Sequence, residues 1–398
     1  MTADPFAPTL DIRKAREARA ALVCGWCGGP VDVPQPGWLP TSGATAYCTA
    51  HHAIEGRHPL GVLANALDGA EWFHDIGSDD LVFWPWQAMN DLAGPLVQGR
   101  ITYLPAFPGG GKTTFLTHCI AFWLQQGKTI TYLPLEADAS EVVARLACYR
   151  VGVSADETLS KRLRIRADRG DVEAAYQLAE VNAEYRRLRE DPDIGMRLRI
   201  EPIEALTKTS FRKAIHACEA MESHLLIVDH IDHVEADENE SGNDIALSNH
   251  LQSAALKAVK RMAIPAVLAT QLNSSRTGGD KLAHFRPPLM DWMYNKGKKD
   301  MIAAGAYGLF RPMDPDATDE EVSRVTSGRA DPATILLPNT MGVARMKARY
   351  GSGLAQRSVF LGYHQGRITD LDATERRALS AAETGVRTGR SASDFGGR

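Results

Sequence analysis

The sequence has little cysteine, few aromatic residues and no long apolar run. Cysteine accounts for 6 of the 398 residues, and Phe, Trp and Tyr together for 7%. Six cysteines are too few for a disulfide scaffold in a chain of this length, which excludes the disulfide-rich secreted proteins. No apolar run approaches the ~20 residues that span a bilayer, and no secretory signal is visible. We therefore predict a cytoplasmic protein without a membrane partner.

The sequence also lacks an excess of either charge. It carries 45 Lys and Arg against 49 Asp and Glu, a net charge of −4. This balance excludes a uniformly basic nucleic-acid coat but allows a local basic patch. Hydrophobic residues make up 44% of the chain, enough for a sizeable core in one large domain with an appendage, or in two to three smaller domains.

Short apolar runs separated by helix-length segments characterise the chain from residue 96 to 372. The runs cover residues 101–104, 129–135, 196–200, 225–228, 266–270 and 306–310. Such runs indicate a mainly parallel sheet flanked by helices, which is an α/β fold. The charged, Ala-rich stretch 158–192 predicts an exposed helical insertion. Closely spaced runs at 333–337, 342–346, 358–361 and 367–369 predict hairpins that extend one edge of the sheet.

The remaining segments divide the chain further. We predict an N-terminal module over residues 1–58, a linker over 59–95 and a flexible tail over 373–398, around the α/β domain at 96–372. The aromatic residues at 83–86 indicate a linker that packs onto a neighbouring domain.

Residues 106–113 have the spacing of a phosphate-binding loop, with Ala106 where the pattern usually has its first glycine. Glycines let backbone N–H groups converge on phosphate oxygens, and the following helix adds its positive end. Lys112 would reach the β- and γ-phosphates, and the Thr113 hydroxyl would ligate Mg²⁺. The alternative is a chance glycine-rich turn. The predicted ATP-binding residues are Ala106, Pro108, Gly109, Gly110, Gly111, Lys112, Thr113 and Thr114.

Asp229 ends the apolar run at 225–228 and supplies the acidic group that a phosphate-binding loop requires. We predict that it binds the nucleotide's Mg²⁺ through a water molecule. His230, Asp232 and His233 follow it and allow a second interpretation, a metal site built from alternating Asp and His. Strand alternation would divide these side chains between two faces, which disfavours that site.

Three cysteines lie within residues 24–48, in a segment too poor in apolar residues for a core of its own. Cys24 and Cys27 form one pair, and Cys48 with His51 forms a second, which is the spacing of a structural zinc site. Four protein ligands would leave no open position, so the Zn²⁺ would stabilise the fold of this module. His52 is an alternative fourth ligand, and unligated cysteines are the alternative to the site as a whole.

Five segments, in order, resemble the RecA-like ATPase core of the DnaB-type replicative helicases, in a phage-like form. They are the loop at 106–113, YLPLE at 132–136, LLIVD at 225–229, LATQLN at 268–273 and MKARYG at 346–351. The resemblance implies ATP hydrolysis between the subunits of a ring, expected to be a hexamer, with single-stranded DNA and other replication proteins as partners.

The resemblance also implies roles for individual residues. Glu136 would be the base that polarises the attacking water, and Gln271 the sensor of the γ-phosphate. Lys347 and Arg349 would reach the neighbouring subunit's nucleotide. A helix-capping role remains an alternative for Glu136, and an exposed strand face for Lys347 and Arg349.

DNA contacts in this family come from loops. Residues 271–300 carry six basic against three acidic residues, a net charge of +3. The candidate DNA contacts are Arg276, Lys281, Lys296, Lys298 and Lys299. Five acids and no base at 235–244 leave open which loop faces DNA, and a solvated surface loop is the alternative.

The N-terminal cysteine module departs from the DnaB pattern, whose N-terminal domain is helical and free of metal. Phage primase-helicases carry such a module, but a polymerising domain separates it from the ATPase. Two alternatives to a helicase remain: a RecA/RadA-type repair or recombination ATPase, and an ATP-gated, zinc-bearing adaptor or loader.

Overall fold

The computed structural model describes residues 81–371, apart from 202, 204, 233, 238–242, 294, 295, 315, 349–357 and 365. The chain divides into two compact units, Met1–Asp80 and Leu81–Arg398, and the described residues all belong to the second. The predicted zinc module, its four ligands and the predicted tail lie outside the described residues. Within the described part, no helix is long and apolar enough to cross a membrane.

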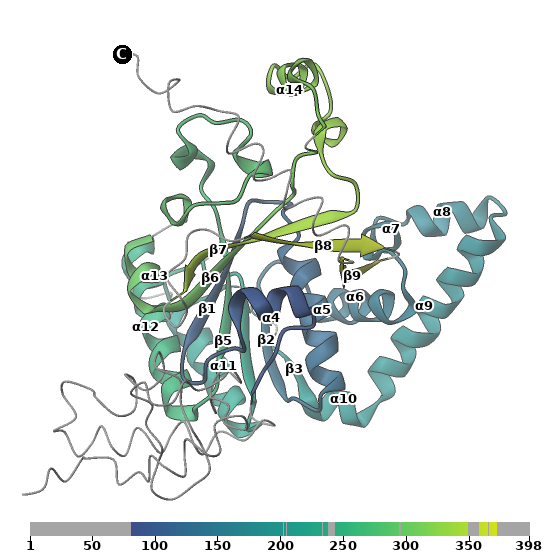
Figure 1. The fold of residues 1–398 in the computed structure, drawn as a ribbon. Helices are drawn as coiled ribbons and strands as arrows, with labels where there is room; N and C mark the ends of the chain where they lie inside the picture. Colours follow the sequence, from purple (N-terminus) through teal and green to yellow (C-terminus); the bar gives the residue numbers. More distant parts are fainter. Residues whose placement is uncertain are drawn as a thin grey trace, which may run out of the picture. The chain divides into compact units, whose positions relative to one another are not determined.

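The described residues form a nine-stranded sheet in the order β3-β2-β4-β5-β1-β6-β7-β8-β9. Strands β3 to β6 in this order are parallel, and β7, β8 and β9 continue the sheet antiparallel. This arrangement confirms the α/β prediction (Figure 1). The strands are β1 (Ile101–Ala106), β2 (Ile130–Pro134), β3 (Leu198–Ile200), β4 (Leu225–Asp229), β5 (Ala266–Gln271), β6 (Ala303–Phe310), β7 (Thr340–Ala348), β8 (Ser358–His364) and β9 (Arg367–Asp370).

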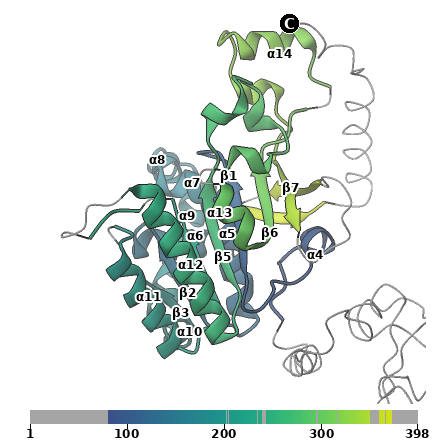
Figure 2. The same ribbon diagram turned by 90° about the vertical axis from the view of Figure 1, so that its left-hand side faces the viewer.

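Helices cover both faces of the sheet, as Figure 2 shows. On one face pack α4 (Gln87–Ala93), α5 (Lys112–Gln125) and α6 (Ala139–Val151), and on the other α11 (Lys208–Ala220), α12 (Asp244–Met262) and α13 (Lys296–Ile302). Neighbouring residues of one strand pack on opposite faces of the sheet. Leu104 belongs to the core on the side of α4, α5 and α6, and Tyr103 to the core on the side of α11, α12 and α13. Because every central strand is buried on both sides, its sequence is continuously apolar.

The aromatic residues at 83–86 belong to this unit. Trp84 and Trp86 are buried in the core that also holds α5. The Trp86 indole donates to the carbonyl of Ile368 on β9 at 2.9 Å, and Asp370 accepts from the first backbone N–H groups of α4 at 2.8 and 2.9 Å. Residues 81–95, the described part of the predicted linker 59–95, therefore close one face of the sheet.

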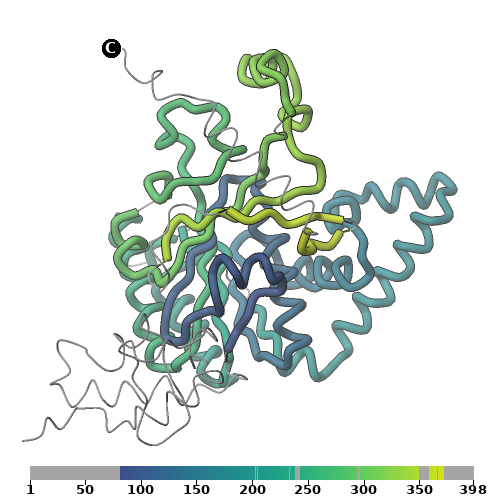
Figure 3. Tube along the Cα trace, viewed as in Figure 1, coloured from purple at the N-terminus to yellow at the C-terminus, as the bar shows by residue number. Residues whose placement is uncertain are grey.

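The charged stretch after α6 forms a helical arm, which confirms the predicted insertion. It consists of α7 (Ala155–Leu159), α8 (Arg162–Asp168), α9 (Val172–Glu190) and α10 (Pro192–Arg197). Asp171 begins α9 by accepting from the N–H of Ala174 at 3.0 Å. The arm extends away from the sheet and returns to it at β3 (Figure 3).

The prediction of a strand at 333–337 was wrong. Pro332–Ile335 forms a short 3-10 helix, η6, because Pro332 cannot donate to a strand ladder and Asp331 accepts from the N–H of Ala333 at 2.8 Å. The connection from β6 to β7 also contains α14 (Asp319–Thr326), which begins with a Thr318–Glu321 capping box. Three further 3-10 helices follow β5: η3 (Ser274–Thr277), η4 (Ala283–Phe285) and η5 (Met290–Trp292).

Candidate nucleotide-binding site

The parallel strands bring four sequence-distant segments to one edge of the sheet. Pro134 of β2 lies opposite Asp229 of β4, and Ala106 of β1 lies opposite Gln271 of β5. The carboxyl ends of parallel strands are where ligands bind in open α/β sheets. Glu136 follows β2, so the phosphate loop and the three predicted polar residues meet at this edge.

The loop between β1 and α5 has the backbone of a phosphate cradle. Gly109 and Gly111 adopt φ values of 71° and 85°, which favour glycine. At Gly110 an added Cβ would come within 2.9 Å of the Phe107 carbonyl oxygen. Gly111 directly precedes the first turn of α5, whose N–H groups can bind an anion. Any larger side chain at these positions would distort the cradle, as the motif predicts.

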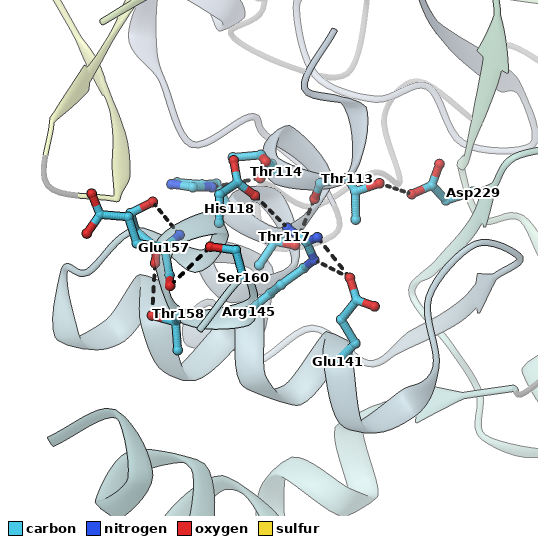
Figure 4. Close-up of polar contacts among 12 residues, drawn as sticks. Thr113, Thr114, Thr117, His118, Glu141, Arg145, Glu157, Thr158, Ser160 and Asp229 are labelled. Carbon is cyan, nitrogen blue, oxygen red and sulfur yellow. Dashed lines mark hydrogen bonds and ion pairs between the residues drawn. The ribbon is translucent and has the colours of Figure 1, made fainter. Parts of the chain in front are cut away.

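The Lys112 side chain is buried. The Thr113 hydroxyl donates to Asp229 Oδ2 at 3.0 Å, as Figure 4 shows. Tyr132 on β2 donates to the same oxygen at 3.2 Å. The other oxygen, Oδ1, is buried and has no hydrogen-bond partner among the described residues. Burial raises the pKa of Asp229, opposed by the Thr113 hydroxyl and the Lys112 ammonium.

A hydroxyl and a carboxylate with an unsatisfied buried oxygen are hard oxygen ligands of the kind that Mg²⁺ takes. The residues therefore fit the ion. Thr113 and Asp229 would hold it, directly or through water, and its charge would be balanced by the nucleotide's phosphates. The cation would also relieve the cost of burying the Asp229 carboxylate.

Glu136, His230 and Gln271 form a connected set beside this pair. His230 Nε2 lies 2.9 Å from Glu136 Oε1, and the Gln271 amide lies 3.0 Å from His230 Nε2 and 3.4 Å from Glu136 Oε1. His230 is fully buried, whereas the Glu136 side chain is 50% exposed. The contacts with His230 and Gln271 thus fix the position of the Glu136 carboxylate, which stays accessible to water.

Two further predicted ATP-binding residues lie in the loop and in the first turn of α5. Pro108 is exposed at the tip of the loop, and the carbonyl of Thr114 is contacted by His118 Nδ1 at 2.7 Å. His118 Nε2 is 3.1 Å from the Gly366 carbonyl, which connects the phosphate-loop helix to the turn before β9.

Lys347 lies on β7, and its ammonium bonds to the side chain of Asp300 at 2.5 Å and to its main-chain carbonyl. Within one chain it therefore contacts α13 and not the phosphate loop. Arg349 lies outside the described residues. The role of both in a neighbouring subunit's site remains a prediction.

The candidate DNA contacts separate into two groups. Arg276 and Lys281 are exposed on the segment that follows β5, and Lys281 donates to the Thr326 carbonyl at 2.7 Å. Lys296 forms an ion pair with Asp291, and Lys298 is partly exposed. Lys299 is different, because its side chain is 0% exposed and pairs with Asp232. We therefore withdraw Lys299 from the DNA-binding set, since its charge has no access to a phosphate.

Sequence reasoning missed the place of His230 and Asp232 in this site. The alternating Asp and His residues after β4 suggested a separate metal site, but His230 faces Glu136, and Asp232 accepts from the N–H of Gln271 at 2.8 Å. Among the described residues, no group of three His, Cys, Asp or Glu side chains is placed to hold a metal. His233 and the predicted zinc ligands lie outside them.

Comparisons with known proteins show which family the chain resembles. The profile of the DnaB-like helicase C terminal domain matches residues 85–291. A solved DnaB-like replicative helicase, described with its interactions with primase, is 14% identical with a TM-score of 0.56, covering 81% of this chain and 71% of that one. The ATPase domain of G40P is 15% identical with a TM-score of 0.53, covering 79% of this chain and 99% of that one. No curated protein matches. Because the profile spans more than half of the chain and includes the phosphate loop, Glu136, Asp229 and Gln271, the protein belongs to the family of the DnaB-like helicase C-terminal domain.

Proposed function

We propose that the protein is an ATP-driven DNA helicase that hydrolyses ATP at the interfaces of a ring and translocates on single-stranded DNA during replication. The observation that carries the proposal is the Glu136–His230–Gln271 set, placed beside the Thr113–Asp229 pair at one edge of the sheet. A nucleotide-gated adaptor needs a cradle for phosphates, but it does not need a held, water-accessible carboxylate beside it.

Each residue of the site would have its own role in ATP hydrolysis. The loop N–H groups and Lys112 bind and orient the phosphates, and Mg²⁺ held by Thr113 and Asp229 would neutralise their charge. Glu136 orients a water molecule for in-line attack and accepts its proton. His230 and Gln271 fix the Glu136 carboxylate, so that it need not reorganise during the reaction.

The trans contacts form a further part of the proposal. Lys347 would exchange its contact with Asp300 for the phosphoryl group in the neighbouring subunit, and Arg349 would stabilise the same group. The side chains of the Lys347–Asp300 pair are 22% and 47% exposed, and partly exposed pairs of this kind are weak enough to exchange. Six subunits, as the resemblance implies, would close a ring.

DNA would pass the segment after β5. Arg276, Lys281, Lys296 and Lys298 lie on residues 274–302, which are joined directly to Gln271. They can neutralise backbone phosphates without reading bases. The zinc module formed by Cys24, Cys27, Cys48 and His51 would contact another replication protein or DNA. The solved relative's interaction with primase makes a primase one partner to test.

ATP turnover with and without single-stranded DNA tests the proposal. We expect Lys112→Ala to lower turnover by about two orders of magnitude or more, the usual effect of removing one charge stabiliser. Lys213→Ala, which changes an exposed lysine on α11, should leave turnover unchanged. Retained turnover in Lys112→Ala would show that the site is assigned wrongly.

The motor claim needs a second measurement. The purified protein with Mg²⁺ and ATP should form closed rings in electron microscopy and unwind a forked duplex. Open filaments without unwinding would favour a recombination ATPase. Turnover that does not respond to single-stranded DNA would favour the adaptor.

A further inference from the structure

Lys299 is a fully buried lysine to which the roles proposed above for ATP hydrolysis assign no function. It lies on α13, and its side chain is 0% exposed. Burial lowers the pKa of its ammonium, and the charge of Asp232 opposes this effect. Removing one partner of a buried ion pair leaves an uncompensated charge and destabilises the fold. Such a pair is therefore favourable only where its geometry is good and further hydrogen bonds satisfy both groups. The partners of Lys299 therefore indicate its role.

Lys299, Asp232 and Thr270 form a closed set. The Lys299 ammonium lies 2.5 Å from Asp232 Oδ1 and also bonds to the Thr270 hydroxyl. The Thr270 hydroxyl in turn donates to Asp232 Oδ2. Each of the three side chains thus contacts the other two, and the loss of any one loosens the remaining pair.

This set is attached to Gln271 through the backbone. The N–H of Gln271 donates to Asp232 Oδ2 at 2.8 Å. The side chain of the same residue extends to Glu136 and His230, at 3.4 and 3.0 Å. Gln271 is therefore held at its main chain by the buried ion pair, while its amide contacts the carboxylate that would orient water.

We propose that Asp232, Lys299 and Thr270 are positioning residues that hold Gln271, and through it Glu136, in the geometry for hydrolysis. The inference rests on the proposed ATP hydrolysis at this site. The three side chains lie behind Gln271 and take no part in binding phosphates. They therefore affect the rate of the chemical step and leave nucleotide affinity unchanged.

Thr270→Val is the sharpest test, because valine keeps the shape of the side chain and removes the hydroxyl. Turnover in saturating ATP should fall about tenfold while the KM for ATP stays within about twofold, the pattern of an interaction realised in the transition state. Thr270→Ser should restore turnover. Thr131→Val is the matched control: Thr131 is equally buried, on β2, and its hydroxyl bonds to Ser223. It should leave turnover unchanged.

A double-mutant cycle separates positioning from general loosening of the fold. In single-turnover measurements, Thr270→Val should change the rate by less than about twofold when Gln271→Ala is already present, because contacting residues are not additive. The double variant Asp232→Asn with Lys299→Met, which leaves no unpaired charge, should behave as Thr270→Val does. Equal losses in the two backgrounds, a parallel rise in KM, or an equal loss in Thr131→Val would overturn the inference. Wild-type protein without ATP turnover would instead overturn the proposed function, before any variant is compared.

Discussion

The edge of the parallel sheet and the helical arm both gather charged side chains, but they use them differently. At the sheet edge, Lys299 and Asp232 are buried and bond to each other and to polar groups of β5. On the arm, pairs such as Arg166–Asp171 join α8 to the start of α9 and are open to solvent, with side chains 49% and 34% exposed. Distance alone does not distinguish the two regions, since both contain pairs shorter than 3 Å.

The difference is one of surroundings. Water screens the ion pairs on the arm and hydrates the two charges when a pair breaks, so each pair contributes little to stability. At the sheet edge little water is available, and each polar group depends on its protein partners. The comparison therefore predicts large effects from changes at the sheet edge and small effects from changes on the arm.

The largest effect is expected at Glu136. Glu136→Gln should lower ATP turnover by about two to three orders of magnitude, the usual contribution of a general base, while nucleotide still binds. Single-turnover kinetics with a separate binding measurement would check this. Glu201→Gln is the control, because Glu201 follows β3 as Glu136 follows β2 but pairs with Arg199. Equal losses in the two variants would remove the distinction between Glu136 and an ordinary carboxylate at this edge.

A pH effect is expected at His118, which lies between the carbonyls of Thr114 and Gly366. Burial lowers its pKa to about 4. The unfolded chain, with a His pKa of about 6.5, binds more protons between these two values, so stability falls as the pH drops from about 6.5 towards 4. Between pH 7 and pH 5 this loss is about 2 kcal/mol.

His118→Gln keeps a hydrogen-bonding side chain that does not titrate. Urea unfolding at pH 7 and pH 5 should show the variant losing about 2 kcal/mol less than the wild type over this range. Identical pH dependence in the two proteins would mean that His118 is protonated as readily in the fold as in the unfolded chain.

An intermediate effect is expected where the arm packs against α6. Glu184 on α9 pairs with Arg150 on α6 at 3.1 Å, with side chains 15% and 20% exposed. Arg187 and then Arg150 lower the pKa of Glu184, so its contribution is present above the unfolded pKa and is lost as the pH falls through the folded one. Glu184→Gln should cost about 1 kcal/mol at pH 7, the upper end for such pairs, and nothing at pH 3. Urea unfolding at both values checks this, and a cost that persists at pH 3 would exclude the charge as its cause.

The smallest effect is expected at the exposed part of the arm. Arg166→Ala removes contacts with Glu157 and Asp171 but leaves the buried face of α8 unchanged. The thermal unfolding midpoint should stay the same within the error of calorimetry, at both low and high salt. A clear fall at low salt alone would show that the arm's pairs act as a network, and would break the comparison.

The fold was largely predictable because its central strands are buried on both faces. Runs such as 225–228 are continuously apolar, and this pattern needs no knowledge of distant partners. The run at 333–337 is also largely apolar, but the Asp331-Pro332 pair before it favours a capped 3-10 turn. Local backbone preferences that oppose an apolar pattern therefore account for the error.

The candidate site was predictable where its chemistry is local. The phosphate loop and Asp229 could be located from short segments, and Glu136 and Gln271 from their resemblance to the family. The contacts of His230 and Asp232 depend on residues that only the sheet brings together. Lys299 was assigned to the surface because a charge count does not register burial.

The position of β1 in the sheet has a consequence for synthesis of the protein. β1 carries the phosphate loop, yet it pairs with β5 and β6, which are made from residues 266–310. A nascent chain that ends after β4 holds all the loop glycines but has neither neighbour of β1. Non-local strand pairing of this kind forms slowly and exposes unpaired edges until it is complete. The ability to bind nucleotide is thus acquired only after most of the domain has left the ribosome.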